Sequence, residues 1–273
     1  MSVNEFLELL IKELESNHEL CHYYRILDSK SSFLFRKAYL EQRLQFVDKS
    51  ITKTNNIIWD TGCGYATTSI FLSLNGYNVI GTTLEYYYDK IQTRLDYWSK
   101  FGDLSALKIK YENLFDAKYD PGTFDAIILQ DTLHHIEPIS DAVDILYKAL
   151  KDDGKIIISE ENGNNIVCNI KHFKERGFKR IAEIYDERLN KKIMFGNENT
   201  RSLKKWIKIF SDNNFSIDNK NTEYIRLFPP VFFNDKNYAK LINTEQKIWK
   251  KNSIVREFLF FGINFLALKK IIR

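Results

Sequence analysis

One short segment restricts the possible folds of this chain more than any other. In residues 57–64 an apolar run ends in Asp60 and breaks into a turn that holds Gly62 and Gly64. The apolar run reads as a buried strand, and residues 67–74 read as the helix after it. A second apolar run follows and predicts another strand. A strand, a glycine turn, a helix and a strand form the unit that binds nucleotide-like cofactors at the carboxyl ends of parallel strands.

The spacing of the glycines distinguishes between classes of nucleotide-binding turn. A dinucleotide site requires G-x-G-x-x-G, and its third glycine would fall where the chain has Thr67. A P-loop requires Gly-Lys-Ser/Thr after the turn, and none follows. Because Gly62 and Gly64 lack Cβ atoms, the backbone can turn sharply and a cofactor can lie directly against it. The turn therefore disfavours an NAD-dependent oxidoreductase and excludes a P-loop enzyme.

Several motifs resemble those of one enzyme family. Residues 60–66, Asp-Thr-Gly-Cys-Gly-Tyr-Ala, resemble the first motif of the class I S-adenosylmethionine-dependent methyltransferases, usually D/E-x-G-x-G-x-G. Residues 124–137 are similar to the family's fourth strand and the loop after it. Residues 151–154 stand where the family often has Lys-Pro-Gly-Gly, and residues 262–265 resemble its closing strand. Their order along the chain is also that of the family.

The resemblance implies a fold and a domain organisation. It covers residues 57–160 well and residues 200–268 more loosely. The expected fold is a Rossmann-like three-layer α/β sandwich with a seven-stranded, mostly parallel sheet of order 3-2-1-4-5-7-6. We expect an N-terminal helical cap over residues 1–50 and a methyltransferase domain over residues 51–273, with residues 161–199 inserted as a lid after strand five.

Periodicity predicts further elements. Apolar residues at helical spacing predict an amphipathic helix over residues 3–14. A polar, irregular stretch over residues 17–32 precedes a helix at 33–47, with Ser31 or Ser32 as its cap. These helices either cover the cofactor cleft or form an ordinary packing pair. Later expected elements are helices at 141–150, at 200–213 with Thr200 as its cap, and at 238–249, and a strand with a tail at 215–227.

Composition narrows the function classes. The chain has 40 basic and 36 acidic residues, a net charge of +4 and no compact basic stripe, which does not indicate nucleic-acid binding. Cys21, Cys63 and Cys168 show no disulfide or metal-ligand spacing, which favours a reducing cytoplasm. No apolar run approaches the roughly 20 residues that span a bilayer. The amino terminus lacks the order of a signal peptide. We expect a cytoplasmic monomer or homodimer without a membrane span.

The resemblance also implies a cofactor, S-adenosylmethionine, with S-adenosylhomocysteine as the product. Thr83 stands where the family usually has an acid, and Glu85 follows it, so either one is expected to contact the ribose; Glu85 is alternatively an exposed carboxylate at a helix start. Asn113 is expected to accept from the adenine amino group, or else to be a plain turn residue. The expected cofactor-binding residues are Asp60, Gly62, Cys63, Gly64, Thr83, Leu84, Glu85, Asn113, Leu114 and Gln130.

Histidines follow the expected fourth strand, close to where the methyl group should lie. His135, or else His134, is the candidate general base, because imidazole can accept a proton near neutral pH. The alternative is a structural role in the loop. Two adjacent histidines without a spaced third ligand do not predict a metal site. The expected substrate-binding residues are Tyr23, Tyr24, Glu160 and Tyr185, where Glu160 alternatively satisfies loop amides.

These observations together predict methyl transfer to a small molecule. The aromatic residues of the cap and lid suggest an apolar or aromatic acceptor, with O-methylation expected first and C-methylation second. One alternative is methylation of a nucleic acid or protein, which the even charge balance disfavours. Another alternative is a non-catalytic binding module with a degenerate cleft, because Ala66, Thr83 and Asn113 depart from the family pattern.

Overall fold

The computed structural model describes residues 1–25, 29–51, 56–86 and 88–270. Its α-helices are α1 (Val3–Ser16), α2 (His18–Tyr24), α3 (Lys30–Ser50), α4 (Thr67–Leu74), α5 (Ile91–Trp98), α6 (Ile139–Ala149), α7 (Ile166–Arg176), α8 (Leu203–Asp212), α9 (Tyr238–Lys251) and α10 (Ser253–Leu259). Its strands are β1 (Ile57–Thr61), β2 (Asn78–Thr83), β3 (Leu107–Tyr111), β4 (Phe124–Gln130), β5 (Leu150–Glu161), β6 (Ile181–Asp186), β7 (Lys191–Gly196), β8 (Phe215–Ile217), β9 (Glu223–Ile225) and β10 (Gly262–Lys269). Within these ranges, no helix combines the length and apolarity that a membrane crossing requires.

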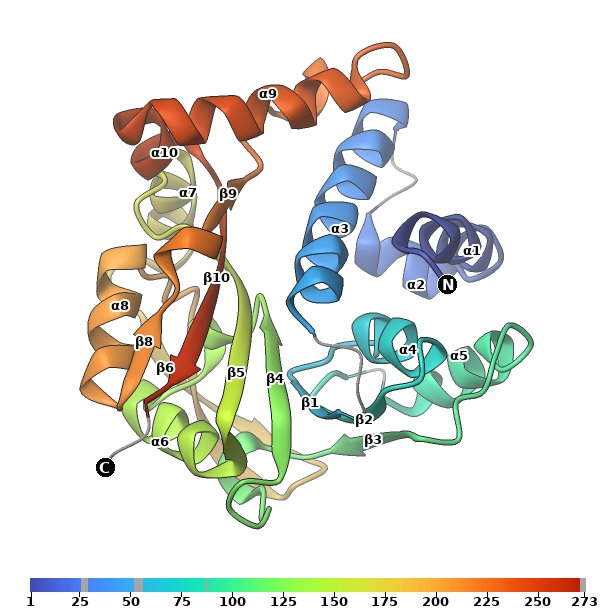
Figure 1. The fold of residues 1–273 in the computed structure, drawn as a ribbon, viewed down its shortest axis with the longest axis vertical. Helices are drawn as coiled ribbons and strands as arrows, with labels where there is room; N and C mark the ends of the chain where they lie inside the picture. Colours follow the sequence, from blue (N-terminus) through green and yellow to red (C-terminus); the bar gives the residue numbers. More distant parts are fainter. Residues whose placement is uncertain (26–28, 52–55, 87, 271–273) are drawn as a thin grey trace.

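The main sheet has eight strands in the order β3-β2-β1-β4-β5-β10-β8, with β9 also paired to β10. The first five strands are parallel to their neighbours. By contrast, β10 is antiparallel to β5, β8 and β9. With β8 as the sixth strand and β10 as the seventh, this is the expected order 3-2-1-4-5-7-6. The predicted α/β fold is therefore confirmed, with one strand more than expected (Figure 1).

Side-chain alternation along the central strands decides what covers each face of the sheet. In β1, Ile58 joins one buried cluster and Trp59 the other; in β4, Ile128 and Ile127 separate in the same way. Successive side chains of a strand point to opposite faces, so each strand contributes to both clusters. The cluster with Ile58 includes side chains of α1, α3, α4 and α5, and the cluster with Trp59 includes side chains of α6 and α8. The result is three layers.

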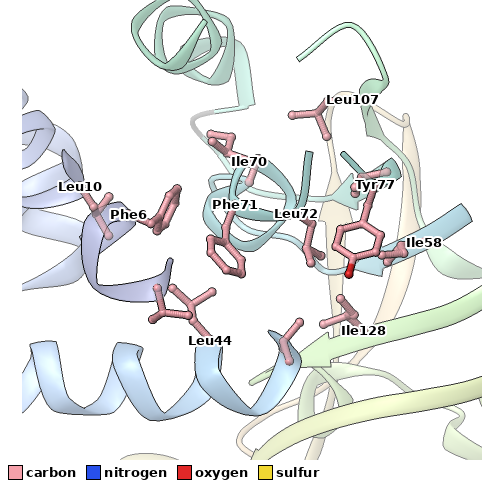
Figure 2. Packing of buried hydrophobic residues seen from close by; sticks show 14 of the residues in the cluster. Phe6, Leu10, Leu44, Ile58, Ile70, Phe71, Leu72, Tyr77, Leu107 and Ile128 are labelled. Carbon is pink, nitrogen blue, oxygen red and sulfur yellow. The ribbon is translucent and has the colours of Figure 1, made fainter. Parts of the chain in front are cut away.

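The first cluster joins the N-terminal helices to the sheet domain. Figure 2 shows Phe6 of α1 and Leu44 of α3 pointing toward Phe71 of α4. The ring of Phe6 lies edge-on to Phe71 at 5.2 Å and stacks on Trp98 of α5 at 4.5 Å between centroids. Burial of each such side chain stabilises the fold by roughly 1.5–3 kcal/mol. The N-terminal helices thus share one core with the sheet; the division into cap, domain and lid stays a prediction.

The predicted N-terminal helices are present, but their connection differs from expectation. The helix expected at 33–47 begins earlier, at Lys30, because the hydroxyl of Ser29 accepts a hydrogen bond from Ser32 N at 3.1 Å. Ser29 therefore caps α3 in place of Ser31 or Ser32. Part of the stretch expected to be irregular forms α2, which Asn17 caps through its side chain. The part of that stretch at 26–28 lies outside the described residues.

The C-terminal half contains two further differences. The strand expected at 215–227 is divided into β8 and β9, because the Asp218 carboxylate accepts hydrogen bonds from Lys220 N and Asn221 N and closes a turn between them. Helix α8 is present, but Ser202 caps it instead of Thr200. The expected lid region contains α7 and an antiparallel hairpin of β6 and β7.

A buried ion pair fixes α1 against α5. Arg94 is 1% exposed, and its Nε and Nη2 donate to the two carboxylate oxygens of Glu13 at 2.8 and 2.7 Å. Trp98 Nε1 donates to the same carboxylate at 2.8 Å. The remaining Nη1 of Arg94 donates to the carbonyl of Tyr65, in the glycine turn, and to Thr67 Oγ1. The pair therefore links the N-terminal helices to the glycine turn.

Removal of one partner from this pair should destabilise the whole chain. Glu13→Ala leaves the Arg94 guanidinium buried without its counter-charge, which typically costs about 3–5 kcal/mol. We expect a loss of that size in the free energy of unfolding, measured by urea denaturation. Glu15→Ala, on an exposed position of the same helix, is the matched control and should change the free energy by less than about 0.5 kcal/mol. Equal effects of the two substitutions would contradict a structural role for the pair.

Candidate active site

The glycine turn lies between β1 and α4 and packs closely against the loop after β4. Gly62 and Gly64 have φ angles of 71° and 55°. A Cβ atom on Gly62 would lie 2.3 Å from Cγ2 of Thr132, so no larger residue fits there. Ala66, where the family motif has a third glycine, also adopts a left-handed φ of 62°. The departure from glycine at this position therefore leaves the shape of the turn unchanged, at a cost of about 1–2 kcal/mol.

Asp60, at the end of β1, links the glycine turn to helix α4. The carboxylate is buried and accepts a hydrogen bond from Ser69 Oγ in α4 at 2.6 Å. Burial raises the pKa of Asp60 to about 6, although the Ser69 hydroxyl opposes this. Cys63 N donates to the carbonyl of Thr82 at 2.9 Å, and burial raises the pKa of its thiol far above the usual range. A neutral buried thiol is a space-filling group and a poor nucleophile.

A small cavity, here the turn pocket, lies against the glycine turn. Its lining includes Gly62, Gly64 and Asp60 from the turn, and Tyr23 and Arg43 from the N-terminal helices. These helices therefore line the pocket beside the glycine turn, while their role as a cap over a cofactor stays a prediction. Tyr24 also lines the pocket, and its hydroxyl bonds to Thr67 Oγ1.

The turn pocket also contains an unpartnered hydrogen-bond donor. Gln130, at the end of β4, accepts from Thr68 Oγ1 through Oε1 at 2.5 Å. Its buried Nε2 has no hydrogen-bond partner among the described residues. A buried donor without a partner is costly unless a ligand satisfies it. The glycine cradle and this donor together fit a ligand with a carboxylate end.

A second cavity of about 240 Å³, here the apolar pocket, lies beside the turn. Thr83, Leu84, Asn113 and Leu114 line one side of it. The side-chain Oδ1 of Asn113 accepts from Phe115 N at 3.0 Å, and Asn113 caps a short 3₁₀ turn. Because an amide oxygen has two lone pairs, this turn role is compatible with accepting a second hydrogen bond from a ligand. The other side is covered by apolar residues of the β6–β7 hairpin, namely Ile184, Ile193, Met194 and Phe195.

A third cavity of about 830 Å³, here the polar cavity, is the largest of the three. Charged groups line it from the N-terminal helices, the segments after β2, β4 and β9, and the lid region. They include Arg36, Arg43, Glu85, Asp131, Glu161, Lys171, Glu198 and Arg226. Aromatic residues, expected from the sequence, form only a small part of the lining of this cavity. Phe173 and Tyr185 are more than half exposed, at 52% and 58%. This cavity therefore does not offer the apolar surface expected for the acceptor, and the nature of the acceptor stays a prediction.

The two candidates for ribose contact occupy different positions. Thr83 lines both the apolar pocket and the polar cavity, whereas Glu85 lines only the latter. The hydroxyl of Thr83 accepts from Glu85 N at 3.1 Å. Burial raises the pKa of Glu85, and a hydrogen bond from Tyr23 opposes this. Thr83 therefore lies closer to the space where a nucleoside would fit.

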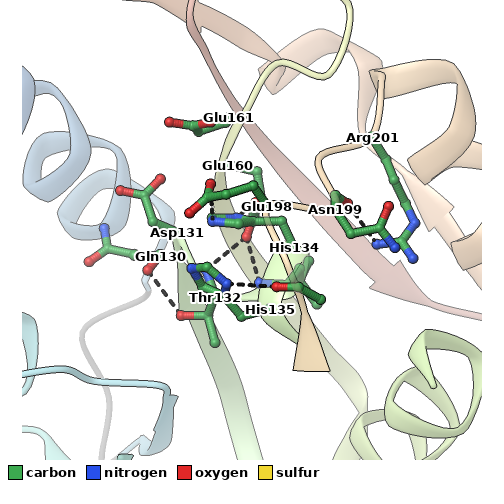
Figure 3. A network of polar contacts seen from close by, with 12 residues as sticks. Gln130, Asp131, Thr132, His134, His135, Glu160, Glu161, Glu198, Asn199 and Arg201 are labelled. Atoms are coloured by element: carbon green, nitrogen blue, oxygen red, sulfur yellow. Dashed lines mark hydrogen bonds and ion pairs between the residues drawn. The ribbon is translucent and has the colours of Figure 1, made fainter. Parts of the chain in front are cut away.

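The loop after β4 is held by Glu160 of β5 (Figure 3). The buried Glu160 carboxylate accepts from Thr132 N at 2.9 Å, Leu133 N at 2.6 Å and His134 Nδ1 at 2.6 Å. Burial lowers the pKa of His134, but the attraction of Glu160 outweighs this and raises it to about 9. Glu160 lines none of the three cavities and satisfies loop amides, the alternative considered for it, so its contact with substrate stays a prediction.

His135 lies where the apolar pocket meets the polar cavity and lines both. Its Nδ1 lies 3.0 Å from the carbonyl oxygen of Gly196, which can only accept, so Nδ1 carries the proton. Burial and the charge of His134 lower the pKa of His135. The ring is therefore neutral, with an unprotonated Nε2. Tyr185, also expected at the site, bonds to Asn190 in the hairpin and lines none of the three cavities.

Several residues of the site carry no signal in the sequence. Asp131, with a φ of 51°, accepts from Tyr39 Oη at 2.9 Å and from Arg43 Nη1 at 2.8 Å. Burial acts to raise the pKa of Asp131, but Arg43 holds it below the usual range. Arg226 lies over the Tyr39 ring at 4.3 Å. Long side chains of helix α3 and of a distant loop thus converge on Asp131, which no local pattern indicates.

One segment of the chain is similar to a known protein family. Residues 59–158 match a family model described as a methyltransferase domain. A ubiquinone biosynthesis O-methyltransferase of Rickettsia conorii is 25% identical over 55% of this chain and 50% of its own length. Its counterpart in Dechloromonas aromatica is 27% identical over 56% of this chain and 63% of its own length. The chain thus spans about half to two thirds of these relatives.

Solved structures share the fold at low sequence identity. Phosphoethanolamine N-methyltransferase 2 of Haemonchus contortus, in complex with S-adenosyl-L-methionine, superposes with a TM-score of 0.57 at 16% identity, over 84% of this chain and 52% of that one. An S-adenosylmethionine-dependent methyltransferase of Methanosarcina mazei has a TM-score of 0.57 at 16% identity, over 83% of this chain and 98% of that one. Residues 59–158 are thus similar to a methyltransferase domain, and the chain shares the fold of S-adenosylmethionine-dependent methyltransferases of known structure.

Proposed function

We propose that this chain is a methyltransferase that transfers the methyl group of S-adenosylmethionine to an oxygen atom of a small, polar acceptor. The observation that carries the proposal is the position of the cavities relative to one another. The apolar pocket and the polar cavity share a group of lining residues, namely Gly62, Thr83, Leu84, Thr132 and His135. A donor in one and an acceptor in the other would therefore meet at the end of β1 and β4.

The residues of the turn pocket and apolar pocket suit the parts of the cofactor. Gln130 Nε2 is a free donor for the carboxylate, and Gly62 allows the methionine end to lie against the backbone. Leu114 and the hairpin side chains would contact the adenine ring, and Thr83 or Glu85 would bind the ribose. The cofactor supplies a methyl group on a positively charged sulfur. The chain's own task is therefore to align two reactants and exclude water.

The polar cavity favours an acceptor with hydrogen-bonding groups. Arg43 and Asp131 are fixed by their mutual ion pair at 2.8 Å, so charged side chains line the cavity in defined positions. Residues of the N-terminal helices and the loop after the hairpin line it on different sides, which favours a small molecule over a nucleic acid or protein. Oxygen is the preferred atom because both curated relatives are named as O-methyltransferases. Carbon is the second candidate.

An acceptor hydroxyl must lose its proton as the methyl group arrives. His135 is the group that can take this proton, because its Nε2 is unprotonated and the ring lines both cavities. His134 is less suited to this role, because its pKa is raised to about 9 and the side chain is nearly inaccessible. General base catalysis typically contributes 10²–10⁴-fold to a rate.

The first test of this function is a substitution in the turn. Gly62→Ala places a methyl group 2.3 Å from Thr132 Cγ2 and should abolish binding of S-adenosylmethionine measured by calorimetry. Gly122→Ala is a matched control, because Gly122 has a similar φ of 70° but nothing within 4 Å of the added Cβ atom. It should keep the affinity within about twofold, since both substitutions cost about 1–2 kcal/mol of backbone strain. A folded wild type that binds neither S-adenosylmethionine nor S-adenosylhomocysteine would instead favour a non-catalytic module.

The second test concerns turnover. Incubation with methyl-labelled S-adenosylmethionine and a protein-free cell extract should label a small, polar, oxygen-methylated product. With that acceptor, His135→Ala should lower kcat about 100-fold and leave the affinity for S-adenosylmethionine within about twofold, because a base acts on the chemical step. An unchanged kcat would remove the base role. An extract in which no small molecule becomes labelled would remove the small-molecule assignment.

A further inference from the structure

Two adjacent histidines in the loop after β4 are both oriented by their Nδ1 atoms. The rings of His134 and His135 lie 4.0 Å apart between centroids. His134 Nδ1 is 2.6 Å from Glu160 Oε2, and His135 Nδ1 is 3.0 Å from the carbonyl oxygen of Gly196. A neutral histidine that donates through Nδ1 has its lone pair on Nε2. His135 already has this form, and His134 would release its Nε2 proton as an ion binds. This is the arrangement in which proteins present histidine to a metal ion.

A third ligand atom comes from the loop that follows β7. The carboxylate oxygen Oε2 of Glu198 lies 3.8 Å from His134 Nε2. One ligand atom from each of Glu198, His134 and His135 can be chosen so that all three lie within 4.8 Å of one another. All three side chains also line the polar cavity. Figure 3 shows Glu198 beside the two imidazole rings.

We infer that His134, His135 and Glu198 bind a divalent transition-metal cation, with Zn²⁺ as the best match. Zinc bonds to imidazole nitrogen and carboxylate oxygen at about 2.0–2.2 Å, which places tetrahedral ligands roughly 3.3–3.5 Å apart. Small side-chain movements close the difference from the distances found here. Imidazole ligands favour such cations over Mg²⁺ or Ca²⁺. Three protein ligands leave a coordination position open toward the polar cavity, as in catalytic zinc sites.

The backbone around the site holds the ligands near one another. A Cβ atom on Gly196 would lie 2.0 Å from the carbonyl oxygen of His134, so the end of the hairpin rests directly on the histidine loop. Asn199 N donates to the same carbonyl oxygen at 3.2 Å, and Asn199 Nδ2 donates to Glu137 Oε1 at 2.6 Å. Glu198 is therefore flanked by two anchored positions. The approach of the two segments is built into the fold and needs no ligand.

A neighbouring group competes for the same carboxylate. His172 Nε2 lies 3.5 Å from both Glu161 Oε2 and Glu198 Oε2. However, the buried Nδ1 of His172 has no hydrogen-bond partner among the described residues, so nothing directs its lone pair to Nε2. His172 is also absent from the lining of the polar cavity. The group of His134, His135 and Glu198 is therefore the better metal site. Substitution of His135 and substitution of His172 distinguish it from the group of Glu161, His172 and Glu198.

The role of the ion rests on the proposed function. An acceptor oxygen at the open position would be polarised, lose its proton to solvent, and attack the methyl carbon as the carbon–sulfur bond breaks and leaves its electron pair on sulfur. The base role of His135 therefore applies to the metal-free chain, in which the lone pair of Nε2 is unoccupied. In the metal-bound chain the ion occupies that lone pair, and the acceptor loses its proton to solvent. The binding of the ion itself requires neither S-adenosylmethionine nor an acceptor.

The test uses the full chain, freed of metal by chelation and titrated with ZnCl₂ in a calorimeter. We expect one Zn²⁺ per chain, and titration with CoCl₂ should give the visible absorption of a low-coordinate cobalt site. His135→Ala and Glu198→Gln should each lower the Zn²⁺ affinity at least tenfold, while His172→Ala should keep it within about twofold. Circular dichroism establishes that each variant is folded. If His135→Ala is unfolded, His135→Gln takes its place.

Two results would overturn the inference. The first is a wild-type chain that takes up no stoichiometric Zn²⁺ or Co²⁺, which would leave His134 as a protonated partner of Glu160 and Glu198. The second is binding that His172→Ala abolishes and His135→Ala retains, which would place the ion in the neighbouring group. Either result leaves binding of S-adenosylmethionine untouched. Conversely, a chain without methyl transfer would still bind the ion, so the two proposals fail separately.

Discussion

The candidate site depends on one buried carboxylate, that of Glu160. It accepts two backbone N–H bonds and one imidazole bond from three consecutive residues of the loop after β4. An ionised group inside a protein is tolerated only when such partners satisfy it. With the loop fixed, Thr132 rests against Gly62 at a distance that permits only glycine. The acceptor side and the cofactor side of the cleft are thereby held in contact.

The N-terminal helices reach the same turn from the other direction. Glu13 and Arg94 form a buried pair whose guanidinium also binds the carbonyl of Tyr65 in the glycine turn. Helix α3 brings Tyr39 and Arg43 to Asp131. The helices are therefore part of the core and of the cleft at once. Changes in their packing would alter the turn pocket as well as the stability of the chain.

The lid region closes the cleft with two kinds of surface. The hairpin places Ile193 and Met194 over the apolar pocket, whereas the loop after it places Glu198 in the polar cavity. An apolar cover suits a planar base, and a charged lining suits a polar acceptor. The division between the apolar pocket and the polar cavity thus follows the change from strand β7 to the loop after it. Gly196, the last residue of β7, lies at this boundary, where its backbone contacts the carbonyl of His134.

The sequence alone determined the strand, turn and helix at 57–74 and the glycine cradle, because these depend on periodicity and backbone preferences within short segments. The strand order was expected from the family resemblance and not from any local pattern. The sequence also indicated His135 and the cofactor. Only the tertiary structure decided that Glu160 holds the loop, that charges line the large cavity, and that Glu198 meets His134 and His135. Those contacts join segments far apart in the chain, and their geometry depends on how the helices and hairpin pack onto the sheet. The residue types and their spacing along the chain do not predict that packing.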